Sequence, residues 1–195
     1  MCHYIESICI EKGLIYNLKG HNDRLNNTRK AIYGDVLPIN LADFIDPLPH
    51  KLRTKCRVEY ARDVINVSYA PYTLRPVSSL RLVTCNDINY SFKSTERSKL
   101  DKLFAMRGSE DDILIVKNNC LTDTSICNIA LWNGSAWETP MYPLLKGTRR
   151  AQLLLEGCVT ERDILVEELE KYSRIRLFNA MIDFGEIELE LGQVK

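Results

Sequence analysis

Hydrophobic and polar positions along the chain predict short strands mixed with amphipathic helices. Residues 4–10 alternate loosely between apolar and polar side chains, and after a Lys-Gly turn signal residues 14–18 have the pattern of a second strand. Within residues 21–33, side chains that are apolar or can pack over an apolar surface recur every three to four positions. Gly34 is a typical residue for the end of such a helix. We therefore expect an opening hairpin, then this helix, and a further short helix at residues 41–45.

Strands and helices continue to alternate through the rest of the chain. β-Branched and aromatic side chains predict two strands within residues 56–69 and another at residues 80–84. Three apolar side chains share one face of a helix predicted over residues 95–106. Beyond it, the pattern predicts short strands at residues 112–116, at 126–132 and around Trp137, helices at 149–155 and 163–172, and closing strands at 174–178 and 186–189.

After the helix predicted at residues 95–106 the pattern changes to short strands separated by Asn-Asn and Asn-Gly turn signals, and we expect a boundary between two lobes around residues 86–91. A chain of 195 residues is long enough for one core or for two small lobes. The sequence therefore predicts an α+β fold. We expect a small N-terminal α/β lobe over residues 1–88 and a strand-rich, barrel-like C-terminal lobe over residues 89–195.

Composition and charge narrow the class of protein. The chain has 26 basic and 26 acidic side chains and 45% hydrophobic residues, so it has no overall field to collect nucleic acid or anionic lipid. It contains no apolar run of about 18 residues and no signal-peptide pattern. The seven cysteines form no C-x-x-C pair, and the three histidines lack the spacing of a metal site. We predict a cytoplasmic protein with free thiols that binds no metal, no nucleic acid and no membrane.

Two segments contain residue types that suit chemistry. Lys93 lies between an aromatic residue and hydroxyl side chains, where partial desolvation would lower its pKa and make its amine usable for Schiff-base chemistry. The same lysine also fits an ordinary surface position. Gly147 and residues 148–150 open a predicted helix, whose first N–H groups and dipole suit a phosphate group. A plain helix start with exposed basic side chains is the alternative interpretation.

A third segment places Asp123 among hydroxyl side chains between two predicted strands. A buried carboxylate at this point could keep a proton on the nitrogen of a pyridine ring, and the alternative is an Asx-type turn. The chain has no G-x-S-x-G motif, no glycine-rich nucleotide loop and no Ser-His-Asp set. The usual sequence support for hydrolases and dinucleotide-binding proteins is therefore missing.

Taken in order, these segments resemble the fold-type IV family of pyridoxal-phosphate enzymes, which includes branched-chain and D-amino-acid aminotransferases and 4-amino-4-deoxychorismate lyases. The resemblance covers nearly the whole chain. The matching segments are residues 4–8 (Y-I-E-S-I), 21–25 (H-N-D-R-L), 93–97 (K-S-T-E-R), 121–128 (L-T-D-T-S-I-C-N), 139–150 with its G-T-R-R end, and 177–181 (L-F-N-A-M). Residues 93–97 are similar to the K-T-T-x-R run of the short lyases, so the resemblance favours that branch and implies a D-amino-acid aminotransferase-like fold.

The resemblance implies a site for pyridoxal 5'-phosphate. Lys93 would hold the cofactor as a Schiff base, Arg24 and the helix start would bind its phosphate, and Asp123 would pair with the ring nitrogen. Lys93 is also the implied catalytic residue, because the lysine released by the substrate amine can act as general base and acid. The implied cofactor-binding set is Arg24, Lys93, Asp123, Asn128, Gly147, Thr148, Arg149, Asn179 and Ala180, and the candidate substrate contacts are Glu6 and Arg97.

The resemblance leaves the reaction open. A lyase would release p-aminobenzoate and pyruvate from aminodeoxychorismate in the folate pathway, a branched-chain or D-amino-acid aminotransferase would make a keto acid, and a non-catalytic relative would only keep the fold or bind the cofactor. Asp123 stands where the family has a glutamate, and Ile182 and Asp183 occupy a stretch where short lyases commonly have an arginine. The family also implies a homodimer that acts on a small-molecule amino substrate.

Overall fold

The computed structural model describes residues 3–195 and divides the chain into two compact units. Unit 1 comprises the chain up to Thr73 together with Phe92–Glu96, and unit 2 comprises Leu74–Ser91 and Arg97–Lys195. This division differs from the expected one between residues 88 and 89. The chain leaves unit 1 earlier, and a five-residue segment then returns to it by pairing its backbone with the first strand.

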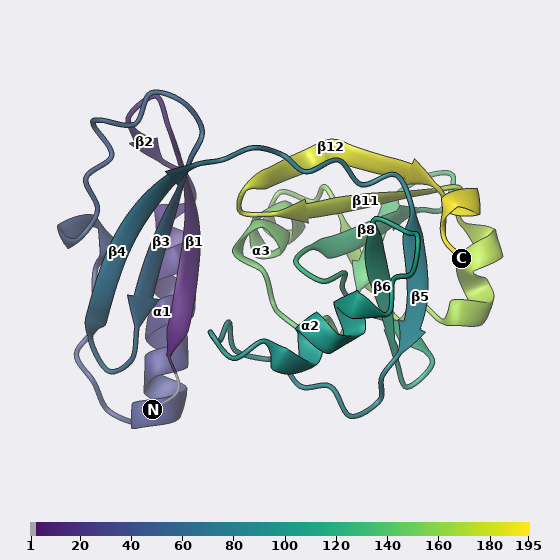
Figure 1. The fold of residues 1–195 in the computed structure, drawn as a ribbon, viewed down its shortest axis with the longest axis horizontal. Coiled ribbons are helices and arrows are strands. Elements are labelled where there is room, and N and C mark those ends of the chain that lie inside the picture. The colour runs from purple at the N-terminus through teal and green to yellow at the C-terminus, as the bar shows by residue number, and fades with distance from the viewer. Residues whose placement is uncertain (1–2) are drawn as a thin grey trace. The chain divides into compact units, whose positions relative to one another are not determined.

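Unit 1 is a four-stranded antiparallel sheet with one long helix along a face (Figure 1). Helix α1 (Leu18–Tyr33) packs on the first strand, begins after Asn17, whose side chain accepts a hydrogen bond from the backbone, and ends at Gly34 with φ of 73°. The expected hairpin and helix are both present, whereas residues 41–45 form only the short 3-10 turn Leu41–Asp43. The strands are β1 (Tyr4–Glu11), β2 (Leu14–Ile15), β3 (Thr54–Tyr60) and β4 (Val64–Pro71), in the order β2-β1-β3-β4.

The core of unit 1 lies between the sheet and α1. Successive side chains of a strand point to opposite faces, and Tyr4, Ile8 and Ile10 of β1 pack in one cluster with Leu25 of α1. Glu6 belongs to the same alternating row and is fully buried. A carboxylate therefore enters an otherwise apolar row of β1 that faces the helix.

Unit 2 contains two sheets. The three-stranded sheet has the order β5-β6-β7, and helix α2 (Ser98–Ala105) lies between its two parallel strands in the chain. The five-stranded sheet has the order β10-β9-β8-β11-β12, and helix α3 (Thr148–Leu155) packs against β11 (Figure 1). The strands are β5 (Leu80–Thr84), β6 (Asp112–Lys117), β7 (Cys120–Leu121), β8 (Asn128–Trp132), β9 (Trp137–Pro140), β10 (Thr160–Arg162), β11 (Arg174–Asn179) and β12 (Ile182–Glu190).

Two expectations for the C-terminal half are corrected. The strand-rich part forms two separate sheets within the described chain and no closed barrel. The helix expected at residues 163–172 is wrong, because only the 3-10 stretch Val166–Lys171 is helical. Its first residues instead pair as extended backbone, with Leu121 N donating to Ile164 O at 2.8 Å. Tertiary pairing thus overrides the local helical pattern.

Across residues 3–195, no helix is long and apolar enough to cross a membrane. The same residues contain no group of three or more metal-ligating side chains. None of the six described cysteines forms a disulfide, and Cys2 lies outside the described residues.

Candidate active site

Lys93 lies in unit 1 on the short segment that pairs with β1. Its carbonyl accepts a hydrogen bond from Ile5 N at 2.9 Å, and Thr95 N donates to His3 O at the same distance. These bonds fix the backbone of Lys93 beside the strand residue that precedes Glu6. The lysine is therefore placed by β-pairing rather than by a helix or a free loop.

Arg24 and His21 both contact Glu6. Arg24 Nε donates to Glu6 Oε1 at 2.9 Å and Arg24 Nη2 to Oε2 at 2.5 Å, while His21 Nδ1 lies 2.6 Å from Oε2. The two basic residues are three positions apart on α1, so they share the helix face that covers the sheet. The result is a buried Glu6–His21–Arg24 cluster inside unit 1.

The electrostatics of this cluster follow from burial and pairing. Burial raises the pKa of Glu6, but the Arg24 charge and the hydrogen bonds from His21 and Arg24 outweigh it and hold that pKa at about 2. Burial lowers the pKa of His21, and the positive charge of Lys93 acts in the same direction, against the favourable contact with Glu6. Glu6 is therefore ionised, and the buried His21 ring is favoured in its neutral form.

Glu6 does not fit the expected role of a substrate contact. Its side chain is fully buried, and both carboxylate oxygens accept hydrogen bonds from α1. A substrate group could reach it only by displacing Arg24 or His21. The structure instead places Glu6 behind Arg24, which is the residue expected to meet the cofactor phosphate.

Asp123 lies in unit 2, two residues after the end of the strand β7. Its Oδ1 accepts a hydrogen bond from Asn128 Nδ2 at 2.8 Å and its Oδ2 from Leu145 N at 2.9 Å. Asn128 Nδ2 also donates to Leu145 O at 2.8 Å, which closes a ring of contacts among the three residues. Burial raises the pKa of Asp123 to about 7, because these neutral donors and the more distant Arg150 charge only partly offset desolvation.

Gly147 lies so close to these hydrogen-bonded residues that a side chain at this position would collide with Asn128. A Cβ placed on Gly147 would approach Asn128 Oδ1 to 2.0 Å, so the close approach requires glycine at this position. Gly147 is the N-cap of α3 and gives it no side-chain cap. The expected helix is present as α3 and begins at Thr148, three residues beyond Leu145.

The two arginines of the helix start have different surroundings. Arg150 is 3% exposed, and its Nη2 donates to Pro140 O and to Glu161 Oε1 at 2.7 Å each, which ties α3 to the adjacent strands. Arg149 is more accessible and pairs with Asp183 at 3.4 Å. The contacts of Arg150 could not be predicted from the sequence, although its position three residues after Gly147 could be read there.

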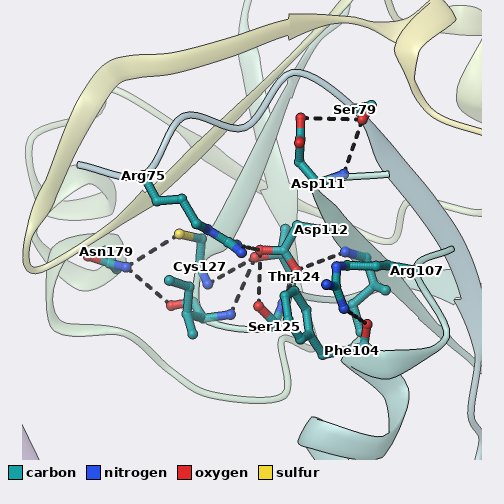
Figure 2. Close-up of polar contacts among 12 residues, drawn as sticks. Arg75, Ser79, Phe104, Arg107, Asp111, Asp112, Thr124, Ser125, Cys127 and Asn179 are labelled. Atoms are coloured by element: carbon teal, nitrogen blue, oxygen red, sulfur yellow. Dashed lines mark hydrogen bonds and ion pairs between the residues drawn. The ribbon is translucent and has the colours of Figure 1, made fainter. Parts of the chain in front are cut away.

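A polar network fixes the turn that follows Asp123 (Figure 2). Asp112 Oδ2 accepts hydrogen bonds from Ser125 Oγ and from Arg75 Nη2, both at 3.0 Å. Thr124 Oγ1 accepts a hydrogen bond from Cys127 N at 3.0 Å within the turn. The Asp112 side chain is only 2% exposed, so its hydrogen bonds anchor the turn from the buried side. Sequence reasoning missed Asp112, whose only visible signal is an acidic residue at the start of a buried strand.

Asn179 ends β11, and Ala180 lies in the two-residue turn that leads to β12. Asn179 Oδ1 accepts hydrogen bonds from Met181 N at 2.8 Å and Ile182 N at 3.1 Å, and its amide reaches Cys127 Sγ at 3.3 Å (Figure 2). This expected cofactor-binding turn is therefore joined to the turn that follows Asp123.

Arg97 belongs to unit 2, unlike Lys93 in the same sequence run. Its Nη2 donates to Ser125 O at 2.9 Å, its Nη1 donates to the Tyr90 hydroxyl at 3.3 Å, and its guanidinium lies over the Tyr90 ring. The side chain is a quarter exposed. These contacts give Arg97 a structural role in unit 2, and its expected contact with substrate stays a prediction.

The structure thus brings the expected residues together in two sets. In unit 1, Arg24 and Lys93 lie near Glu6 and His21; in unit 2, Asp123 and Asn128 lie beside the start of α3, and the Asn179 turn contacts the same loop. His21 was missed as a member of the first set. The H-x-x-R spacing on one helix face was the signal that could have found it.

The fold is mixed α+β, with a buried carboxylate beside a helix start and a lysine fixed by strand pairing. Comparison with known proteins shows the family to which such a chain belongs. The model of the family "Amino-transferase class IV" matches residues 4–188. An uncharacterized protein of Haemophilus influenzae is 38% identical over 181 residues, which cover 90% of this chain and 96% of that protein. The chain belongs to the class IV aminotransferase family.

Solved structures agree with this assignment. A protein of Haemophilus somnus, named a "putative 4-amino-4-deoxychorismate lyase", has a TM-score of 0.86 at 30% identity over 93% of this chain and 97% of its own. A Mesorhizobium loti protein, named a "putative amino-acid aminotransferase", has a TM-score of 0.83 at 20% identity over the full length of both chains and shows the same fold. The expected family and α+β fold are therefore confirmed, and with the family the class of pyridoxal-phosphate-dependent enzyme.

The residues present fit this cofactor. Asp123 is a buried carboxylate whose hydrogen bonds come from neutral donors, so a protonated pyridine nitrogen would supply the cation that this environment lacks. Helix α3 begins after Gly147, which has no side chain to cap it, and the first turn of a helix is a common binding site for phosphate. Both features belong to unit 2 and stand independently of Lys93.

Proposed function

We propose that this chain is a pyridoxal-phosphate-dependent 4-amino-4-deoxychorismate lyase, which releases p-aminobenzoate and pyruvate. The observation that carries the proposal is the similarity to the Haemophilus somnus protein over nearly the full length of both chains. The run K-S-T-E-R at residues 93–97, similar to that of the short lyases, supports the same branch.

The proposed cofactor contacts are those that the family resemblance implies. Lys93 supplies the amine that attaches the cofactor, and Arg24 binds its phosphate together with the backbone N–H groups of Thr148 and Arg149. Asp123 would pair with the ring nitrogen, Asn128 hydrogen-bonds Asp123, and Gly147 leaves room for Asn128 at the start of α3. The Asn179–Ala180 turn borders the same region of unit 2.

When bound, the cofactor supplies an electron-withdrawing ring that stabilises negative charge on the substrate carbon. Asp123 serves this chemistry by holding a proton at the ring nitrogen, for which an ionised carboxylate is needed. With the cofactor bound, Lys93 Nζ would take a proton from the substrate carbon and return one to the leaving fragment. Arg97 is proposed as a carboxylate contact for the substrate.

The wider setting of the activity is also proposed. We place the protein in the cytoplasm and in folate synthesis, acting on a small-molecule amino substrate, as a homodimer of the kind the family resemblance implies. Its balanced charge supports the absence of nucleic-acid and membrane partners.

A product assay tests the proposed reaction. The purified protein with added pyridoxal phosphate is given aminodeoxychorismate, and p-aminobenzoate and pyruvate are measured without any amino acceptor. We expect equal amounts of both products and the loss of both in Lys93→Ala. Keto-acid formation from branched-chain or D-amino acids that requires an acceptor would support an aminotransferase instead. A protein that forms neither product set would support the non-catalytic alternative.

A further inference from the structure

Glu6 carries a charge that packing alone does not explain. It occupies a core-facing position of β1, opposite Val58 of β3, and is fully buried. Taking a carboxylate out of water is costly unless the geometry of its partners is good. An apolar residue would fill the row between Tyr4 and Ile8 without this cost.

Arg24 meets Glu6 along one edge of its guanidinium. The bonds from Nε at 2.9 Å and Nη2 at 2.5 Å engage both carboxylate oxygens. Such a two-point contact fixes the plane of the guanidinium and directs the Nη1 side away from the carboxylate. The side chain of Arg24 is 15% exposed, whereas that of Glu6 is inaccessible. Glu6 therefore controls the orientation of a cation that can still meet a ligand.

His21 holds the carboxylate from the preceding turn of α1. Its Nδ1 lies 2.6 Å from Oε2, the same oxygen that Arg24 Nη2 contacts. Because Glu6 is ionised and accepts only, His21 Nδ1 is the donor. The oxygen is thus held by two donors from one helix, which limits rotation of the Glu6 side chain.

Lys93 belongs to the same part of unit 1. Its carbonyl is bonded to Ile5 N, the residue next to Glu6, and its charge acts on His21. One strand therefore carries the Glu6 carboxylate and also fixes the backbone of the lysine. Movement of Arg24 relative to β1 would change its position relative to Lys93.

We propose that Glu6 is a positioning residue, which aims Arg24 at the phosphate of the cofactor while His21 braces the carboxylate. The proposal rests on the proposed function, since it takes the phosphate role of Arg24 from there. Glu6 acts through Arg24 and touches neither the cofactor nor the substrate. It replaces the expectation that Glu6 contacts substrate.

The test compares binding of pyridoxal phosphate with binding of pyridoxal, which lacks the phosphate. The ratio of the two Kd values isolates phosphate recognition from attachment to the lysine and from general stability. In Glu6→Gln the amide presents a donor to the donors of Arg24, so we expect the preference for the phosphate form to fall at least tenfold. Arg24→Gln should give a similar loss, and the double variant should be no worse than Arg24→Gln, because one residue acts through the other.

Glu59→Gln is the matched control. Glu59 lies opposite Ile5 in the same sheet and also pairs with a histidine, His3, at 2.8 Å, but it is partly exposed and has no contact with Arg24. Its loss should leave the ratio unchanged. If Glu6→Gln fails to fold by circular dichroism, Glu6→Asp takes its place, because it keeps the charge and withdraws the carboxylate by one methylene; a smaller fall in the ratio is then expected.

The possible failures are distinct. If Arg24→Gln lowers the ratio of Kd values but a folded Glu6→Gln does not, the positioning role is overturned and the phosphate role of Arg24 stays intact. If Glu6→Gln does not fold, an unchanged ratio in a folded Glu6→Asp has the same meaning. A ratio unchanged in both Glu6→Gln and Arg24→Gln, with cofactor still bound, would show that their ion pair is structural only. A wild-type protein that binds neither form would reject the proposed function itself.

Discussion

Two buried carboxylates, Glu6 and Asp123, have opposite electrostatic environments. Burial raises the pKa of each, but Glu6 has the Arg24 charge beside it and stays at about 2, whereas Asp123 has neutral donors and rises to about 7. Glu6 is therefore a fixed charge that positions its partners. Asp123 is a group whose ionisation a cationic ligand would favour. Their different environments follow from contacts across the fold, which no local sequence pattern shows.

The raised pKa of Asp123 predicts how stability depends on pH in the cofactor-free protein. Between the unfolded value near 3.8 and the folded value of about 7, the folded state binds the extra proton, so the contribution of Asp123 to stability is greatest at low pH and falls as pH rises. The span corresponds to about 4 kcal/mol in the free energy of unfolding. Asp123→Asn should flatten this fall between pH 5 and 8, measured by urea unfolding at each pH.

Asp101→Asn is the control for that measurement, because Asp101 is a mostly exposed carboxylate on α2. It should keep the wild-type dependence on pH. A slope in Asp123→Asn as steep as that of the wild type would show that Asp123 is not the group responsible.

Among the elements, the turn at residues 124–127 is held by its neighbours rather than by a helix or a hairpin of its own. Asp112 at the start of β6 bonds Ser125, and Asn179 at the end of β11 bonds Cys127 (Figure 2). Two strands that are distant in sequence therefore fix the turn between Asp123 and β8. Such a turn can present a rigid edge to a ligand without regular structure.

Asp112→Asn tests whether this anchoring matters. The change weakens the contacts to Ser125 and to Arg75, and we expect the free energy of unfolding to fall by about 1–3 kcal/mol, the cost of leaving a buried polar group poorly satisfied. Hydrogen exchange at the Ser125 and Cys127 amides should become faster. Asp111→Asn is the matched control, since the neighbouring carboxylate bonds Ser79 instead (Figure 2). Equal protection in both variants would contradict the anchoring role.

Elements with a strong local signal could be predicted from the sequence. The strand β5 has the predicted bounds, and α1 starts three residues earlier than predicted and ends at Gly34 as expected. The Asn118–Asn119 turn was also expected, and both residues have the positive φ that a tight hairpin requires. Residues 163–166 could not be predicted in the same way, because their pairing partner Asn119–Leu121 lies more than 40 residues away.

For the whole molecule, the order of motifs was more informative than any one of them. Lys93, Asp123 and Gly147 each had an ordinary structural explanation when taken alone, yet their order along the chain indicated the family that the comparison confirms. The boundary between the units was less accessible, because the return of Phe92–Glu96 to β1 depends on backbone hydrogen bonds that any sequence can make. The sequence likewise could not show that Glu6 is enclosed by α1.

The central claim is that Lys93 is the attachment point of the cofactor. The direct measurement adds pyridoxal phosphate to the protein, records its absorbance, reduces the complex with borohydride and maps the modified lysine by mass spectrometry. We expect a visible absorbance band and a label on Lys93, both absent in Lys93→Ala and both retained in Lys99→Ala, a control whose lysine pairs with Asp87 on the surface. A label on another lysine, or a band that persists in Lys93→Ala, would contradict the account.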